Sequence, residues 1–278
     1  MQKYIHLIRL DKPLAILLLF LPCLFGLALS VENIGNYYYL IIYFALGSLL
    51  MRSAGCVIND ILDKNFDSQI ARTKNRPIAA NKVSKREAFI LFAILVSLGF
   101  VVLLQFNLKV IFSGFAAFIL LITYPLMKRI TFYPQIFLGL AFNFGLLMAI
   151  IQINNSISLQ AIILFLATII WTVIYDGFYA FQDIEDDIKI GVKSCAIKFQ
   201  KFPKFIFSCL AMAMFAAMIL VGLIANYSLS YFLINFFIFL AQLIIIKKCN
   251  FADPKSCLIS FKKNIIIGLL IFLSLIAK

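Results

Sequence analysis

The chain alternates long apolar runs with short polar connections. Nine of the runs are close to the length of about 17 to 25 residues that a helix needs to cross a bilayer. They lie near residues 14–31, 37–58, 87–106, 110–127, 133–153, 159–178, 205–225, 228–246 and 263–277, and the last is short. This pattern predicts an all-α fold, a multi-pass bundle of about nine transmembrane helices that forms one domain over residues 1–278.

The connections between these runs alternate in charge. The N-terminus and the segments after the second, fourth, sixth and eighth runs carry 22 of the 25 Lys and Arg residues. The remaining connections are nearly bare, with only Lys109 between the third and fourth runs. Because cytoplasmic loops of membrane proteins are enriched in Lys and Arg, the basic set and the N-terminus are predicted to be cytoplasmic.

Composition supports a membrane protein. Hydrophobic residues make up 64% of the 278 residues and the mean hydropathy is +1.03, whereas about half of a soluble domain is apolar. A net charge of +13 would suggest nucleic acid in a soluble protein, but here the cations flank the spans, so no nucleic-acid partner is expected. No Arg/Ser-rich leader precedes the first run, which favours a bacterial inner membrane.

Cysteine and histidine offer little chemistry. The six cysteines include no C-x-x-C pair and several lie in apolar runs, so we interpret them as small buried hydrophobic residues. His6 is the only histidine, which leaves no catalytic triad or zinc site to consider.

An acidic segment follows directly on the second run. Asn59, Asp63 and Asp67 are spaced by four residues, so on a helix their oxygen-bearing side chains form one row. Carboxylate and amide oxygens suit Mg²⁺, which often bridges protein carboxylates to the phosphates of a substrate.

A second row follows the sixth run. Asp176, Asp183 and Asp187 are seven and then four residues apart, spacings that also fall on one helical face. The alternative for either row is a solvated loop charge. Two rows at helical spacing on one predicted membrane face favour a bound cation, because clustered carboxylates repel one another unless cations neutralise them. The rows close the second and sixth spans, as in the internal duplications of many membrane folds.

One arginine lies inside an apolar run. Arg52 precedes Asn59 by seven residues and therefore shares its helical face. An intramembrane arginine is costly and marks either a function or a buried ion pair. Arg9 and Lys12, which enter the first span, are either membrane anchors or ligands.

Other cations follow the first row or precede the fifth apolar run. Arg72 and Arg76 come five and nine residues after Asp67, and guanidinium groups fit phosphate oxygens well. Lys128 follows Tyr124 by four residues, so both side chains can point into the bundle. The alternative for this basic set is contact with lipid headgroups.

These features together predict a reaction class. Carboxylate rows with Arg and Lys above a lipid-accessible apolar bundle fit a substrate with a diphosphate head and a long hydrocarbon tail. Mg²⁺ and the cations would stabilise the departing diphosphate, and an allylic carbocation would need shielding from water. An alternative of a different class is a cation transporter with an acidic mouth, but such a pathway usually needs polar residues through the bilayer midplane.

The motifs resemble the UbiA superfamily of intramembrane aromatic prenyltransferases, and most of all its members that act on 4-hydroxybenzoate in ubiquinone biosynthesis. The resemblance covers nearly the whole chain, and its motifs are highly specific when taken together and in order. It depends on Arg9 with 11–13, on 51–52, on 55–58 running into the N-D-x-x-D-x-x-x-D pattern of 59–67, on 72–73, 75–77, 124–125, 128–131, 134–135, Trp171, 175–176, 179–180, Asp183, 186–187 and 189–194.

The resemblance implies roles for individual residues. The expected ligands of Mg²⁺ and diphosphate are Asn59, Asp63, Asp67, Asp183 and Asp187, with Asp176 nearby. It further implies that Arg72 and Lys128, with Tyr124 close by, contact the diphosphate and that Arg52 meets the carboxylate of the acceptor. We count Arg9 and Arg76 among the substrate-binding residues as well.

The implied reaction joins the first carbon of a polyprenyl tail to the ring carbon ortho to the hydroxyl of 4-hydroxybenzoate. Ala15 and Gly177 stand where Gly and Thr are expected in this subfamily, and both changes are small. A naphthoate, homogentisate or chlorophyll-type acceptor would use the same metal site, whereas Arg52 favours a benzoate. Prenyl chain length would depend on the depth and fenestration of the apolar cavity.

Overall fold

The computed structural model describes residues 2–11, 13–70 and 72–278, and these residues form helices and connecting turns without a strand. All nine predicted spans appear as helices. They are α2 (Leu14–Ser30), α3 (Tyr38–Leu62), α5 (Lys85–Leu103), α6 (Leu108–Thr123), α8 (Pro134–Asn154), α9 (Leu159–Ala180), α12 (Pro203–Ala225), α13 (Leu229–Lys248) and α14 (Pro254–Ile276). The short helices are α1 (Gln2–Leu7), η1 (Ile34–Tyr37), α4 (Lys64–Asp67), η2 (Tyr124–Leu126), α7 (Met127–Ile130), α10 (Ile184–Ile190) and α11 (Cys195–Phe199).

The long helices identify an integral membrane protein. In the described part of the chain, eight helical segments are long and apolar enough to cross a membrane, and α2, with 17 residues, is a shorter apolar helix. The last helix begins at Pro254, well before residue 263 where the apolar run starts, because Asp253 caps it by accepting from the backbone N–H groups of Lys255 and Ser256. The first turns of this helix are polar, so the hydropathy pattern did not include them.

Local sequence explains most of the other helix ends. Ser84 and Glu87 form a capping box at the start of α5, and Asn107 caps α6. Asn155 and Asn226 adopt left-handed backbone conformations, with φ of 56° and 53°, that end α8 and α12. These turns keep consecutive spans antiparallel.

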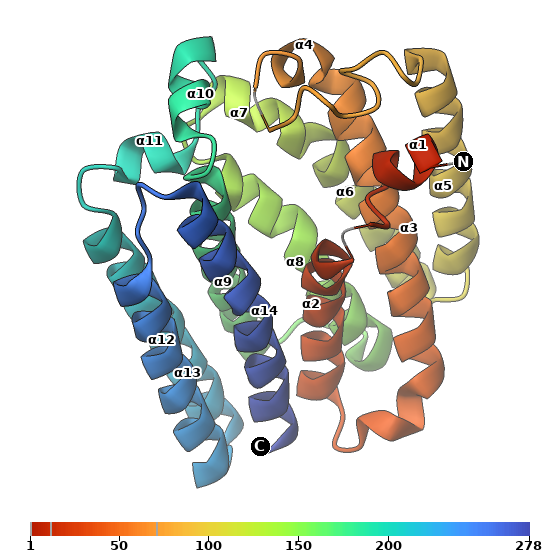
Figure 1. Ribbon diagram of the computed structural model, residues 1–278. Coiled ribbons are helices and arrows are strands. Elements are labelled where there is room, and N and C mark those ends of the chain that lie inside the picture. The colour runs from red at the N-terminus through yellow and green to blue at the C-terminus, as the bar shows by residue number, and fades with distance from the viewer. Residues whose placement is uncertain (1, 12, 71) are drawn as a thin grey trace.

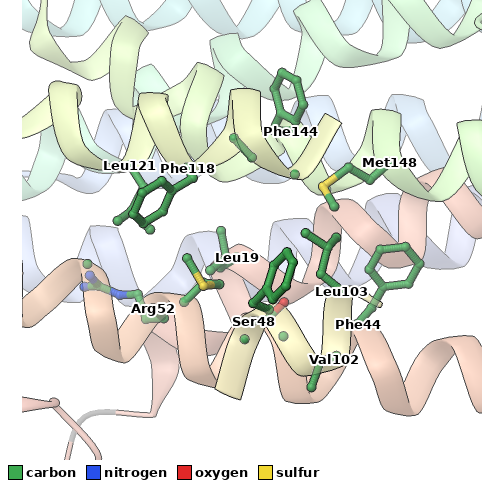
Figure 2. A pocket seen from close by; sticks show the side chains of 18 of the residues that line it. Leu19, Phe44, Ser48, Arg52, Val102, Leu103, Phe118, Leu121, Phe144 and Met148 are labelled. Atoms are coloured by element: carbon green, nitrogen blue, oxygen red, sulfur yellow. The ribbon is translucent and has the colours of Figure 1, made fainter. Parts of the chain in front are cut away.

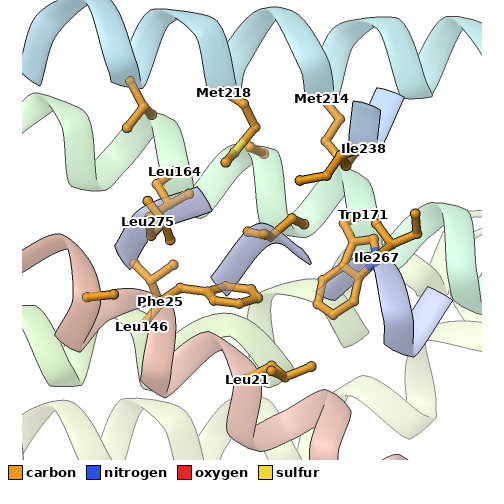
Figure 3. Close-up of a cluster of buried hydrophobic side chains, with 14 of the residues drawn as sticks. Leu21, Phe25, Leu146, Leu164, Trp171, Met214, Met218, Ile238, Ile267 and Leu275 are labelled. Atoms are coloured by element: carbon orange, nitrogen blue, oxygen red, sulfur yellow. The ribbon is translucent and has the colours of Figure 1, made fainter. Parts of the chain in front are cut away.

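The helices pack as a bundle with most of its short helices at one end (Figure 1). Helices α4, α7 and α10 lie at that end, and the C-terminus lies at the other. The largest buried cluster joins α2, α8, α9, α12, α13 and α14 around Trp171 and Phe25, whose ring centroids are 6.0 Å apart (Figure 3). Gly268 allows this packing, because a Cβ there would approach the Trp171 ring to 2.7 Å.

The cysteines are free thiols, and five of the six are buried as predicted. The prediction is wrong for Cys209, which is exposed on α12. Its helix presents apolar side chains on its outer surface too, so hydropathy alone does not separate the two faces.

Candidate active site

The first acidic row keeps its helical spacing across a break in the helix. Helix α3 ends at Leu62, yet the Asp63 N–H donates to the Asn59 carbonyl and the Asp67 N–H donates to the Asp63 carbonyl, both at 2.8 Å. Asp60, Asp63 and Asp67 are all buried, with at most 3% of their surface exposed. Buried carboxylates need compensating charge, and each of the three has a cationic partner.

The second row is not one continuous helix, contrary to the expectation from its spacing. Asp176 lies in α9, which ends at Ala180, whereas Asp183 precedes α10 and Asp187 lies within it. The chain turns between the two helices because Phe181 is buried in an aromatic cluster, with its ring 4.8 Å from that of Phe251. The four-residue spacing of Asp183 and Asp187 survives through a backbone hydrogen bond of 2.8 Å.

Arg72 joins the two rows. It comes from the loop after the first row, and its Nε donates to Asp183 Oδ1 of the second row at 2.8 Å, while its Nη2 forms an ion pair with Asp183 Oδ2. Its Nη1 donates to the Tyr179 hydroxyl at 2.6 Å, and the guanidinium carbon lies 4.8 Å from the centre of that ring. Segments more than a hundred residues apart in sequence therefore meet at one end of the bundle.

Lys128 provides a second connection. Its ammonium group forms an ion pair with Asp63, and its backbone carbonyl accepts from the N–H of Lys193, past the second row, at 2.9 Å. The neighbouring Arg129 donates to the Leu62 carbonyl at 2.9 Å. The short helix α7 thus lies between the two rows.

Asp60 holds two further arginines. Arg9 Nη2 donates to both of its carboxylate oxygens, at 2.8 and 2.9 Å, and Arg76 Nη1 donates to Oδ1 at 3.2 Å. Arg76 also donates to Asp67 Oδ2 at 2.7 Å. The guanidinium groups of Arg9 and Arg76 thus lie on carboxylates of this chain, whereas Lys12 falls outside the described residues.

We expect Asp60→Asn to destabilise the protein. The change leaves the Arg9 and Arg76 guanidiniums, whose side chains are only 18% and 19% exposed, without this counter-charge, at a cost of about 3 kcal/mol. Thermal unfolding in detergent should show a midpoint lower by several degrees. Asp11→Asn, which breaks the more exposed pair with His6, should leave the midpoint nearly unchanged, and equal shifts would contradict the expectation.

The oxygens of the rows fit a divalent cation. Asn59 Oδ1 and Asp63 Oδ1 are buried and have no hydrogen-bond partner within the described residues. Burial raises the pKa of Asp187 to about 6, with the neighbouring Asp183 adding to the effect, and burial also raises the pKa of Asp63 against the opposing charge of Lys128. A cation beside either carboxyl favours its ionised form. No three acidic, His or Cys side chains already converge on one point within residues 2–11, 13–70 and 72–278.

An apolar cavity of about 580 Å³ lies among α2, α3, α5, α6 and α8. Arg52 lies at one end, and Phe44 and Met148 lie at the other (Figure 2); Tyr124 also lines the cavity. The Arg52 Nε is buried without a hydrogen-bond partner in the described residues, and its guanidinium carbon lies 5.5 Å from the Phe142 ring centre. The structure thus places Arg52 in the cavity, without an ion pair to any other described residue.

Sequence reasoning gave no role to two residues that shape the site. Tyr179 holds the guanidinium of Arg72, and its position four residues before Asp183 was an available signal. Thr73 is buried and donates from its hydroxyl to the Asp67 carbonyl at 3.0 Å. Nothing in the local pattern indicates that contact, because it depends on how the loop folds back.

The fold and the site together define a polytopic membrane protein that gathers carboxylates, guanidinium and ammonium groups beside an apolar cavity. The sequence profile of the UbiA prenyltransferase family matches residues 19–276 of this chain. The chain belongs to this family.

Curated relatives share nearly the whole chain. The 4-hydroxybenzoate octaprenyltransferase of Pseudomonas aeruginosa (strain LESB58) is 40% identical over 282 residues, which cover 99% of this chain and 92% of the relative. The mitochondrial 4-hydroxybenzoate polyprenyltransferase of Rattus norvegicus is 38% identical over 279 residues, which cover 99% of this chain and 74% of the relative.

Solved structures share the fold. A UbiA homolog from Aeropyrum pernix K1 matches with a TM-score of 0.77 at 21% identity, covering 94% of this chain and 96% of that one. A UbiA homolog from Archaeoglobus fulgidus bound to GPP and Mg²⁺ matches with a TM-score of 0.74 at 18% identity, covering 99% and 100%. The same homolog has also been solved with Cd²⁺, so divalent metals bind within this fold.

Proposed function

We propose that this protein transfers a polyprenyl group from a polyprenyl diphosphate to the ring carbon ortho to the hydroxyl of 4-hydroxybenzoate, with Mg²⁺, as one transmembrane domain over residues 1–278. The observation that carries the proposal is that the two acidic rows meet, with Arg72 from the loop after the first row bound to Asp183 of the second and Lys128 paired with Asp63 of the first. A cavity lies beside them, and among its described lining residues Arg52 is the only charged one. The names of the relatives support this choice of acceptor.

The head of the donor would bind between the rows. Arg72 and Lys128 are the donors available to diphosphate oxygens, with Tyr124 nearby, and Asn59, Asp63, Asp67, Asp183 and Asp187 are the oxygen ligands available to Mg²⁺, with Asp176 on the adjoining helix. When bound, Mg²⁺ neutralises diphosphate charge and favours departure of the leaving group. Arg72 and Lys128 add to that stabilisation because ion pairs with Asp183 and Asp63 already hold their charged groups in place.

The cavity would hold the reacting carbon and the acceptor. Cleavage of the C–O bond leaves an allylic cation, which the apolar lining shields from water. Arg52 would bind the carboxylate of 4-hydroxybenzoate and so orient the ring. The carbon ortho to the hydroxyl then supplies the electron pair of the new C–C bond, and its proton leaves to restore the aromatic ring.

A product assay tests the proposal. Purified protein in detergent is incubated with 4-hydroxybenzoate and geranyl or octaprenyl diphosphate, with Mg²⁺ or with EDTA, and the products are identified by mass spectrometry. We expect the ring-prenylated acid only with Mg²⁺. Turnover with a naphthoate or homogentisate but not with 4-hydroxybenzoate would overturn the choice of acceptor, and absence of turnover with any phenolic acid would reject the enzyme.

Arg52→Gln tests the assignment of the acceptor. Loss of a buried charged partner costs about 2 to 4 kcal/mol, so the KM for 4-hydroxybenzoate should rise on the order of 10²-fold while the KM for the prenyl diphosphate changes little. With the neutral 4-hydroxybenzamide as acceptor, the same substitution should raise the KM far less. Equal effects on the acid and the amide would show that Arg52 does not bind the carboxylate.

The membrane orientation is proposed on charge. The Lys and Arg residues concentrate at the end of the bundle that carries both rows, which supports a cytoplasmic site and a cytoplasmic N-terminus. We place the protein in a bacterial inner membrane. Single cysteines placed at Lys74 and at Glu32 should react with a membrane-impermeant thiol reagent from opposite sides of the membrane.

A further inference from the structure

A second hollow lies at the end of the bundle that carries the acidic rows, and it shares no described lining residue with the apolar cavity. We call it the α12 groove. It is open to the surface, has a volume of about 770 Å³, and is lined by Phe181, Ile184, Gln200, 202–205 and 248–252. Since a water molecule takes about 30 Å³ in the liquid, the groove has room for an organic group and not only for an ion.

The α12 groove is positively charged. Lys204 and Lys248 are the only charged side chains among its described lining residues, and both are exposed. The Lys204 ammonium group donates to the Lys247 carbonyl at 3.1 Å, which holds it between the start of α12 and the end of α13. The first turn of α12 adds backbone N–H groups that no described side chain caps, since Phe202 at the N-cap has no acceptor atom. An anion is therefore the ligand that this groove attracts.

The mouth of the α12 groove is apolar. Phe202 and Phe205 are 59% and 70% exposed, and they lie where the membrane span of α12 begins. Lys201 adds a further charge there, with its ammonium group 5.4 Å from the centre of the Phe202 ring. A lipid with a charged phosphate and apolar acyl chains matches both the lysines and the exposed rings, whereas a soluble anion matches only the lysines.

The inner wall of the α12 groove belongs to the turn that presents the second acidic row. Phe181, which is buried, and Ile184 both line the groove, and they flank Asp183 in the sequence. Asp183 is the carboxylate that Arg72 binds. A ligand in the groove therefore packs against the turn that positions Asp183.

We propose that the α12 groove binds an anionic phospholipid of the surrounding membrane, with its phosphate between Lys204 and Lys248 and its acyl chains beside Phe202 and Phe205. Basic pockets between transmembrane helices are suited to such headgroups. The lipid is bound and not altered, so it is a structural ligand and not a substrate. Its binding stabilises the turn that carries Asp183 and does not depend on the proposed reaction.

Thermal unfolding with added lipid tests the proposal. Purified full-length protein in detergent is mixed with dioleoylphosphatidylglycerol, dioleoylphosphatidylcholine or glycerol 3-phosphate. Because a ligand of the folded state stabilises it, phosphatidylglycerol should raise the unfolding midpoint by at least about 3 °C more than phosphatidylcholine does. Glycerol 3-phosphate should have little effect. Lys204→Gln/Lys248→Gln should lose most of this rise, and Lys204→Arg/Lys248→Arg should keep it.

Lys82→Gln/Lys85→Gln is the matched control. Both lysines are exposed near the start of α5, at the same end of the bundle and outside the α12 groove, so this variant removes the same charge from the same surface. It should keep the full rise with phosphatidylglycerol. The midpoint of each variant without lipid shows that it is folded.

Hydrogen exchange gives a second readout at the groove itself. With phosphatidylglycerol, the amides of 184–190 should exchange more slowly in the unaltered protein and in the control, but not in Lys204→Gln/Lys248→Gln. An equal rise in midpoint with phosphatidylcholine or with glycerol 3-phosphate, an unchanged rise in Lys204→Gln/Lys248→Gln, its loss in both Gln variants, or no protection of 184–190 overturns the proposal. Neither measurement uses prenyl transfer, so a failure here is distinct from a failure of the proposed function.

Discussion

Asp63→Asn is expected to lower kcat for prenyl transfer on the order of 10²- to 10³-fold. The substitution keeps the volume of a side chain that is 2% exposed, but it removes the negative charge that faces Lys128 and one anionic oxygen from the proposed metal site. The Mg²⁺ concentration needed for half-maximal rate should rise as well. Rates measured against Mg²⁺ with saturating donor and acceptor check both effects.

Glu185→Gln is the matched control for Asp63→Asn. Glu185 belongs to the second acidic segment but is exposed, and neither the sequence nor the structure gives it a role in the site. Its loss should change kcat by less than about twofold and leave the Mg²⁺ requirement unaltered. If Asp63→Asn retains full activity, or if both variants lose the same activity, the first acidic row is not the metal-binding element.

Arg72→Gln should produce a loss of similar size in kcat/KM for the polyprenyl diphosphate, about 10²-fold or more. A neutral amide cannot supply the charged fork of donors that now spans Asp183 and Tyr179 and that we expect to serve the diphosphate. The KM for 4-hydroxybenzoate should move little, since the acceptor is assigned to Arg52. Initial rates with each substrate varied in turn separate the two.

Lys74→Gln makes the same change of charge two residues away on an exposed side chain, and it should leave kcat/KM for the polyprenyl diphosphate nearly unchanged. Arg72→Lys adds a second comparison, because it keeps the charge but not the forked pair of donors. Its kcat/KM for the polyprenyl diphosphate should lie between those of Arg72→Gln and the unaltered protein. A variant of Arg72 that raises only the KM of the acceptor would disprove its assignment to the diphosphate.

The sequence was sufficient to predict the spans and the helical spacing within the first row and between Asp183 and Asp187. Both are local properties: a helix needs a minimum apolar length to cross the membrane, and oxygens four residues apart share a helical face. The start of α14 escaped prediction because Asp253 and Pro254 begin that helix in a polar segment.

The pairing of charges could not be predicted, because it is tertiary. Arg72 and Asp183 are 111 residues apart, and nothing in either segment indicates that this arginine meets that carboxylate and not Asp187. The break of the second row at Phe181 depends on an aromatic cluster to which Phe207 contributes from α12 and Phe251 from the turn between α13 and α14. The roles of individual residues toward metal, diphosphate and acceptor stay predictions.

The bundle is filled unevenly, and this affects how the family can diversify. Around Trp171 the helices interlock so closely that a single methyl group at Gly268 would collide with the indole ring, whereas α5 and α6 border open space. Where they border that space, helices α5 and α6 can therefore accept changes in side-chain size without a collision. The opposite half is under a steric constraint that fixes side-chain size, so inherited variation in side-chain volume should accumulate on one side of the molecule only.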